Sequence, residues 1–470
     1  MPTSNDALGK TLAAIDADHD NALERLKALL RIPSISTDPA YKADVKRAAQ
    51  VLVDDLTGLG FDASLRETPG HPMVVAHHDG PAPVDGKSAP HVLFYGHYDV
   101  QPVDPIELWD TDPFEPTIRD GKLFARGASD DKGQLMTFVE ACRGYKSATG
   151  GLPCRVTIFF EGEEESGSPS LEPFLDAAAD ELRADIALVC DTSQWNADTP
   201  AITTALRGMS SDELVIHAAS RDLHSGYYGG AAANPIHVLT KILADLHDDT
   251  GAVTLEGFYD GVEETPDDVK AGWDKLTAVK DTLLSEVGLS VPSGEKGRSA
   301  LENTWARPTA EVNGITGGYT GDGFKTVIPA RASAKVSFRL VGQQDPDKVA
   351  AAFRARVDAR LPADCRAEWH PHGRNPASQL PWDLPQLTKA AQALTDEWGA
   401  EAAIIAGGGS IPVVGNFKRQ LGMDSLLIGF ALSDDAIHSP NEKYELRSFQ
   451  KGTRSWARVL AALAQGDDQG

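Results

Sequence analysis

The sequence predicts an α/β fold divided between two domains. Its 470 residues exceed the length at which one hydrophobic core is the usual arrangement. Short apolar runs alternate with helical patterns up to about residue 200 and again over residues 383–464, which is the rhythm of βαβ units. The pattern changes near residue 204. We therefore expect a discontinuous domain over residues 1–203 and 379–470 with a mostly parallel sheet, and an inserted α+β domain over residues 204–378.

In the first domain, helices are expected where apolar residues recur every three or four positions. This spacing predicts helices over residues 9–31, 42–58 and 132–145. Buried strands are expected where four or five largely apolar residues follow one another. Such runs occupy residues 92–95, 156–160, 186–190 and 426–430.

The inserted domain has a different pattern. It is expected to contain one amphipathic helix, over residues 234–247, and an acidic segment over residues 253–300 that is helical or irregular. Its strands are predicted at residues 213–217, 327–341 and 364–370.

The charge of the chain excludes some classes of partner. The net charge is −25, from 44 basic and 69 acidic residues, whereas a nucleic-acid surface needs a basic footprint. No polybasic segment for a membrane surface is present. The acidic balance serves solubility, and part of it could also favour cation uptake.

The cysteines and the start of the chain bear on the compartment. Cys142, Cys154, Cys190 and Cys365 are scattered and form no CxxC pair, so neither a zinc ribbon nor a disulfide framework is indicated. No cationic segment followed by an apolar one opens the sequence, and no run of about 18 apolar residues occurs. We expect a cytoplasmic protein with reduced thiols.

Side chains that bind metals stand at the ends of the predicted buried strands. His97 closes the first strand, Glu163–Glu165 follow the second, Asp191 follows the third, and His438 comes a short loop after the fourth. Open α/β sheets bind ligands at the carboxyl ends of their strands. This placement predicts a metal-dependent hydrolase.

Asp130 and the glutamate run each have a simpler explanation. Asp130 precedes a predicted helix, where an aspartate commonly caps the first turn, but its carboxylate could also bridge two cations. The glutamate run could be a surface acidic run. Crowded carboxylates at a strand end are costly unless cations neutralise them, so we expect one glutamate to bind metal and another to accept a proton from water. Asp99 lies on the same side of an extended chain as His97 and can fix its tautomer.

Five stretches of the sequence together resemble the M20 family of co-catalytic metallopeptidases, which includes carnosinase-like dipeptidases, glutamate carboxypeptidases and deacylases. The similarity covers roughly residues 20–460 and keeps the family's order. The stretches are Gly96–Pro102, Trp109 with Asp112–Phe114, Arg126–Gly133, Glu161–Ser168 and His438–Glu442.

The resemblance implies a site with two divalent metal ions in each subunit. One metal would be held by His97 and Asp191, and the other by Glu165 and His438, with Asp130 bridging the two. Glu164 would be the general base that takes the proton of a water bridging the metals, and Asp99 the orienting carboxylate. Zinc is expected, and manganese or cobalt also suit nitrogen and oxygen ligands.

The middle domain resembles the lid and dimerisation domain of the family. The resemblance implies that His224 reaches the site of a partner subunit and steadies an oxyanion. Arg339 would grip the substrate carboxylate with its planar guanidinium. Thr326, Ser410 and His372 are further candidates for substrate contact. A homodimer through this domain is expected.

One position departs from the family pattern. Dipeptidase-like relatives often place an acidic residue where this chain has Gly407, and an acid there could bind a free substrate amine. The expected substrate is a dipeptide or short peptide with a free carboxylate, and the alternative is an N-acyl amino acid cleaved by a deacylase. A non-catalytic relative would lack a ligand or the base, and none is missing. A nucleotide phosphatase is not supported, because the sequence contains no phosphate-binding loop.

Overall fold

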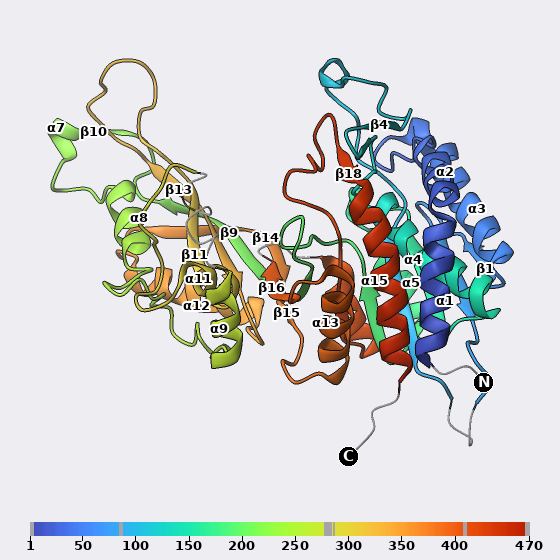
Figure 1. Cartoon of the computed structure of the whole chain (residues 1–470). Coiled ribbons are helices and arrows are strands. Elements are labelled where there is room, and N and C mark those ends of the chain that lie inside the picture. Colours follow the sequence, from blue (N-terminus) through green and yellow to red (C-terminus); the bar gives the residue numbers. More distant parts are fainter. Residues whose placement is uncertain (1–3, 84–87, 277–283, 285–286, 408–410, 466–470) are drawn as a thin grey trace. The chain divides into compact units, whose positions relative to one another are not determined.

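The computed structural model describes residues 4–83, 88–276, 284, 287–407 and 411–465 (Figure 1). The chain forms two compact units. The first unit comprises Met1–Thr204, Leu380–Ile405 and Asn416–Gly470, and the second comprises Ala205–Gln379 and Ala406–Gly415. Residues 406–415 thus group with the second unit, whereas the sequence pattern placed them with the first.

A mixed sheet forms the centre of the first unit. Four neighbouring strands at its centre run parallel, and the pairs toward both edges are antiparallel. The α/β class is therefore confirmed, with a sheet that is parallel only at its centre. The strand order is β1 (Asp62–Arg66), β2 (Met73–His78), β6 (Arg155–Glu161), β3 (His91–His97), β7 (Ile186–Val189), β17 (Ser425–Leu427), β8 (Ala201–Leu206) and β15 (Ser378–Gln379), with β16 (Ala403–Gly407) paired to β8.

The helices of the first unit pack beside this sheet (Figure 1). The helix predicted over residues 9–31 is two helices, because the chain turns at Asp18, whose carboxylate accepts hydrogen bonds from Asn21 and Arg25. The main helices are α1 (Ser4–Ala17), α2 (His19–Leu30), α3 (Lys42–Gly58), α4 (Lys132–Thr149), α5 (Leu171–Ala177), α6 (Ala179–Leu182), α13 (Pro385–Trp398) and α15 (Leu446–Ala464). A small sheet of β4 (Thr117–Arg119), β5 (Lys122–Phe124) and β18 (Lys443–Glu445) completes the unit.

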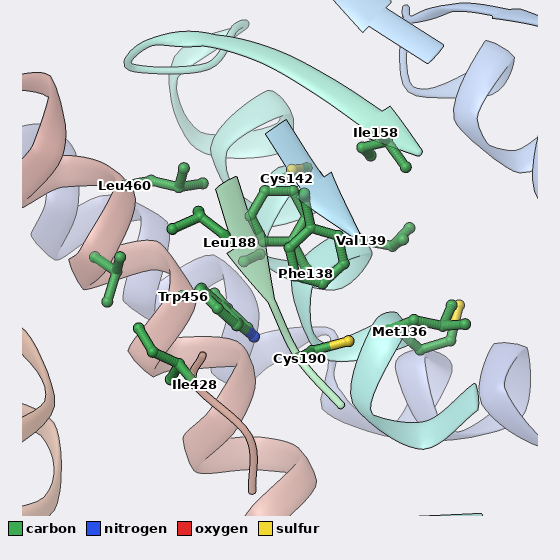
Figure 2. Close-up of a cluster of buried hydrophobic side chains, with 14 of the residues drawn as sticks. Met136, Phe138, Val139, Cys142, Ile158, Leu188, Cys190, Ile428, Trp456 and Leu460 are labelled. Carbon is green, nitrogen blue, oxygen red and sulfur yellow. The ribbon is translucent and has the colours of Figure 1, made fainter. Parts of the chain in front are cut away.

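An aromatic cluster joins the sheet to its helices. Phe94 of β3 stacks on Phe138 of α4 with ring centroids 3.8 Å apart, and the indole of Trp456 from α15 meets both rings edge-on. Figure 2 shows Phe138 and Trp456 among further buried side chains from the sheet and α15. These contacts hold β3 and α4 in a fixed relation. The strand end at His97 and the loop before α4 are therefore anchored to the same core.

The second unit has the α+β organisation that the sequence predicts for its middle segment. Along β13, buried and more exposed residues alternate, and the buried face carries Val336 and Phe338. This face packs against helices that contribute Leu239 and Phe353. Its sheet has the order β11 (Thr309–Gly317), β13 (Arg331–Leu340), β9 (Gly208–His217) and β14 (Arg366–Asn375), and its main helices are α8 (Pro235–Ala244) and α12 (Pro346–Arg360).

Shorter elements complete the second unit. They are the strand pair β10 (Leu223–His224) and β12 (Val327–Ile328), with the helices α7 (Ser225–Tyr228), α9 (Asp267–Lys275) and α11 (Ala300–Trp305). The helix α14 (Pro412–Asn416) lies where the chain returns to the first unit. In the part of the chain that the structure describes, no helix combines the length and apolar character needed to cross a membrane.

Candidate metal centre

Five side chains from separate segments of the chain meet at the carboxyl end of the parallel strands. His97 Nε2 lies 3.0 Å from Asp130 Oδ1 and 4.0 Å from Asp191 Oδ2. His438 Nε2 lies 2.9 Å from Asp130 Oδ2 and 3.2 Å from Glu165 Oε2. The side chains therefore form two groups of three possible ligands, and Asp130 belongs to both. Each oxygen of the Asp130 carboxylate faces a different histidine, so the carboxylate stands between the two groups.

The carboxylates of this cluster lie so close together that nearby positive charge stabilises them. Burial and the neighbouring Asp130 raise the pKa of Asp191 to about 7. Hydrogen bonds to Asp130 and Glu165 raise the pKa of His438 to about 10. Burial alone would lower the pKa of His97, but its hydrogen bonds with Asp130 and Asp99 raise it well above the usual value. Protons on the histidines thus offset carboxylate charge here, and bound divalent cations would do so more fully. The donor set of imidazole nitrogen and carboxylate oxygen fits zinc, manganese or cobalt.

The three consecutive glutamates have different surroundings. Glu163 is 2% exposed, and its carboxylate accepts hydrogen bonds from the backbone N–H groups of His71 and Ser170. Glu165 is one of the five possible ligands described above, which we call the metal-type cluster. It also accepts a 2.7 Å hydrogen bond from Gln101 Nε2. Among the described residues, the Glu164 carboxylate has no hydrogen-bond or ion-pair partner within the usual distances, and burial raises its pKa. Of these three glutamates, Glu164 is therefore the one whose carboxylate is free of partners among the described residues.

Asp99 contacts His97 and the glutamate turn through different atoms, which the sequence did not predict. Its backbone oxygen lies 3.1 Å from His97 Nδ1, closer than its carboxylate oxygen at 3.4 Å. The carboxylate instead accepts hydrogen bonds from the backbone N–H groups of Glu164, at 3.3 Å, and Glu165, at 3.0 Å. Asp99 therefore orients the imidazole mainly through its main chain and holds the glutamate turn through its side chain.

Several buried ionisable groups beside these five residues were not identified as such from the sequence. Glu442 accepts four hydrogen bonds from residues 126–130. Asp131 accepts from the backbone N–H of His97, and Lys132 Nζ donates to the carbonyl oxygens of Leu29 and Ile32. All three residues lie inside the stretches that resemble the family, and this position was the signal that could have marked them as part of the site. Burial of a charge is not visible in a sequence.

The second unit holds the other candidate residues. His224, at the end of β10, accepts a 3.0 Å hydrogen bond at Nδ1 from the backbone N–H of Gly226, and its ring is exposed. The carbonyl of Thr326 accepts from the backbone N–H of Ser225, so His224 and Thr326 lie on neighbouring chain segments. His372 is exposed, at an irregularity of β14. Ser410 lies outside the described residues.

Arg339 has a cationic neighbour that the sequence did not reveal. Arg339 is half-buried on β13, opposite Thr309 of β11. Arg207 is 8% exposed and donates to Thr309 Oγ1. Burial and the charge of Arg339 lower the pKa of Arg207 to about 10. The backbone N–H of Arg207 also donates to the carbonyl of Gly407, the position that departs from the dipeptidase pattern.

Comparison with known proteins gives consistent results. The model of Peptidase family M20/M25/M40 matches residues 93–462. The Cys-Gly metallodipeptidase dug1 of Schizosaccharomyces pombe is 30% identical, covering 97% of this chain and 98% of that protein. The human Beta-Ala-His dipeptidase is also 30% identical, covering 97% of this chain and 93% of that protein. A solved M20 family metallo-carboxypeptidase, Sso-CP2 from Sulfolobus solfataricus, has 31% identity and a TM-score of 0.74, covering 94% of this chain and 99% of that chain.

Proposed function

Because the chain belongs to peptidase family M20/M25/M40 and is therefore a metallopeptidase, we propose that it hydrolyses dipeptides or short peptides beside their free C-terminal carboxylate. The observation that carries this proposal is the position of Asp130 between two histidines, at 3.0 and 2.9 Å. This arrangement supports a site for two divalent cations, with Glu164 beside it as an available carboxylate.

The proposed ligands divide as the two groups do. His97 and Asp191 would hold one cation, Glu165 and His438 the other, and Asp130 both. Bound cations would supply an activated water and polarise the scissile carbonyl. Zinc is the first candidate, with manganese and cobalt as alternatives.

The chain's own residues handle the protons and the substrate. Glu164 removes the proton of the attacking water and returns it to the leaving amine. Its raised pKa, caused by burial, suits a group that must both accept and release a proton. Arg339 would bind the substrate carboxylate as a fork, and His224 would steady the oxyanion in a partner subunit. Thr326, Ser410 and His372 are proposed to contact the substrate.

The names of similar proteins favour dipeptides over N-acyl amino acids. Relatives covered over nearly their whole length are named Cys-Gly metallodipeptidase, Beta-Ala-His dipeptidase and Cysteinylglycine-S-conjugate dipeptidase. An N-acyl-amino-acid deacylase is not favoured. Because Gly407 departs from the dipeptidase pattern, the preference for dipeptides over N-acyl amino acids needs to be measured.

A hydrolysis panel read by mass spectrometry tests this proposal. Manganese- or zinc-loaded protein is incubated with free dipeptides such as Cys-Gly and β-Ala-His, and with N-acetyl amino acids. We expect the dipeptides to be cleaved. Cleavage of the acylated compounds alone would replace the proposal by a deacylase, and hydrolysis of neither class by loaded protein would refute it.

Two properties of the whole protein are also proposed. The first is a homodimer through the second unit, supported by the exposed apolar side chains Val312 and Ile315 on the edge strand β11.

The second is a cytoplasmic location, supported by scattered cysteines that are all free thiols.

A further inference from the structure

Glu442 is a buried carboxylate that binds the loop carrying Asp130. It stands directly before β18, and its side chain is 0% exposed. Oε2 accepts from Arg126 Nη1 at 2.8 Å and from the backbone N–H of Gly127 at 2.9 Å. Oε1 accepts from the backbone N–H of Ser129 at 2.8 Å and from that of Asp130 at 3.1 Å. One carboxylate thus fixes the main chain up to Asp130.

The same segment carries His438. Asp435 ties this segment to itself and to the loop, because its carboxylate accepts from the backbone N–H of Leu432, from Ser129 Oγ and from Lys443 Nζ. His438 lies between Asp435 and Glu442 in the chain. The loop with Asp130 and the segment with His438 therefore meet at Glu442 and Asp435, more than 300 residues apart in sequence.

We propose that Glu442 is a positioning residue that sets the separation of Asp130 from His438, and thereby the affinity of the cluster for divalent cations. The inference rests on the proposed metal site and assigns to it a residue outside the ligand set. Arg126 and three backbone N–H groups all donate to this one carboxylate, so both of its oxygens hold the loop in place. Groups that hold metal ligands in place typically change affinity about 10- to 100-fold when replaced.

The simpler explanation is that Glu442 only neutralises the buried Arg126. That role would need the 2.8 Å contact with Arg126 alone and would leave Oε1 without a purpose. Instead, Oε1 accepts from two consecutive backbone groups, one of them belonging to Asp130 itself. The two explanations differ in what a neutral replacement does to metal binding.

The test is a Co²⁺ titration of metal-free full-length protein, followed by visible absorption and by metal content after desalting. Glu442→Gln keeps the volume, but its amide NH₂ must face two of the four donors, so the loop shifts. We expect about 10- to 100-fold weaker Co²⁺ binding and a changed absorption band. Glu442→Asp, which keeps the charge but is one methylene shorter, serves as a second variant if the first does not fold, with the same expectation.

Glu397→Gln is the matched control. Glu397 is also a buried carboxylate, 4% exposed, and it accepts from Arg454 Nε and Arg458 Nε between α13 and α15. Its replacement should lower the melting temperature and leave the Co²⁺ titration unchanged. Coincident titrations and spectra for wild type, Glu442→Gln and Glu397→Gln would overturn the inference. Asp130→Ala distinguishes a failure of the positioning role of Glu442 from a failure of the proposed metal site. Undiminished Co²⁺ binding by Asp130→Ala would refute the metal site itself.

Discussion

Glu163, Glu164 and Glu165 are chemically identical side chains in three different environments. Glu163 closes the turn by accepting two backbone N–H groups, Glu165 faces His438, and Glu164 keeps its oxygens available. The turn that separates them is held by Asp99, whose carboxylate accepts the N–H groups of Glu164 and Glu165. The proposed roles of the three neighbours therefore differ: Glu163 in structure, Glu165 in metal binding and Glu164 in proton transfer.

Replacement of Glu164 should affect turnover and little else. Because no described residue is hydrogen-bonded or ion-paired to its carboxylate, Glu164→Ala should leave folding and metal content unchanged. A general base typically contributes about 10²- to 10⁴-fold to the rate, so kcat for a dipeptide should fall by about that factor. Steady-state kinetics and metal analysis of the purified variant check both points. A kcat near the wild-type value would remove Glu164 from its role.

At the scale of elements, helix α4 begins against the loop that carries Asp130. Gly133 stands in its first turn, where an added Cβ would lie 1.9 Å from the carbonyl oxygen of Ala128 and 2.8 Å from the ring of Tyr444. Lys132, one residue earlier, donates to the carbonyl oxygen of Leu29 in the last turn of α2. The start of α4 therefore joins two helices and the metal-type cluster.

Gly133→Ala should destabilise the protein by about 1–3 kcal/mol, because the nearest contacting atom is a main-chain carbonyl oxygen that cannot easily yield. Gly151→Ala is the matched control, since a Cβ there meets nothing within 4 Å, and it should stay within about 0.5 kcal/mol of the wild type. Denaturant unfolding of the three proteins measures the difference. Equal midpoints would show that the start of α4 can relax.

Lys132 should make stability depend on pH. Burial lowers its pKa to about 7 in the folded chain, whereas the unfolded value is about 10.4. Between these values the unfolded chain binds more protons, so the contribution of Lys132 to stability rises with pH. The neutral amine still has two N–H groups for the carbonyls of Leu29 and Ile32. In metal-free protein, the stability difference between wild type and Lys132→Met should shift in favour of wild type from about pH 7 to about pH 8.5, by at most about 1.4 kcal/mol per pH unit. A constant difference would contradict the lowered pKa.

The sequence predicted most elements because their apolar patterns are local. The strand ending at His97 and the helix over residues 42–58 were found in this way. The break at Asp18 was missed, since the apolar spacing continues across it. Strand β9 begins at Gly208, earlier than predicted, because its first half buries polar residues. One of them, Asp212, is paired with Arg354 and Arg374, which lie far away in sequence.

At the scale of the whole molecule, the second unit presents an open strand edge. Among the described residues, strand β11 pairs with β13 alone, and Ile315 on it is 56% exposed. Such an edge with apolar side chains favours association with another chain. The proposed dimer would use it, and the proposed role of His224 in a partner subunit requires a dimer.

Light scattering after size exclusion should give twice the chain mass of 50.2 kDa. Ile315→Asp should shift the mass toward one chain, because a buried charge opposes association at the edge. Ile106→Asp is the control, with a comparably exposed isoleucine, 51%, in the first unit. An active monomer whose specific rate does not change with concentration would refute the role of His224 in trans.

The five residues of the metal-type cluster could be predicted from the sequence because each follows an apolar strand or lies in a recognisable motif. The groups that hold them could not. Glu442 contacts residues more than 300 positions away, and the Gln101–Glu165 hydrogen bond depends on how two loops fold together. Only the three-dimensional arrangement shows which charges are buried.

The most direct test of the central claim is the metal content of wild-type protein and of three ligand variants, measured with dipeptide hydrolysis on the same samples. We predict two divalent ions for each wild-type chain, loss of hydrolysis on chelation, and its return when two ions are restored. Asp130→Ala should lose both ions, because its carboxylate belongs to both groups, whereas His97→Ala and His438→Ala should each lose one. Full hydrolysis by chelated, metal-free protein, or two ions retained by Asp130→Ala, would contradict the account.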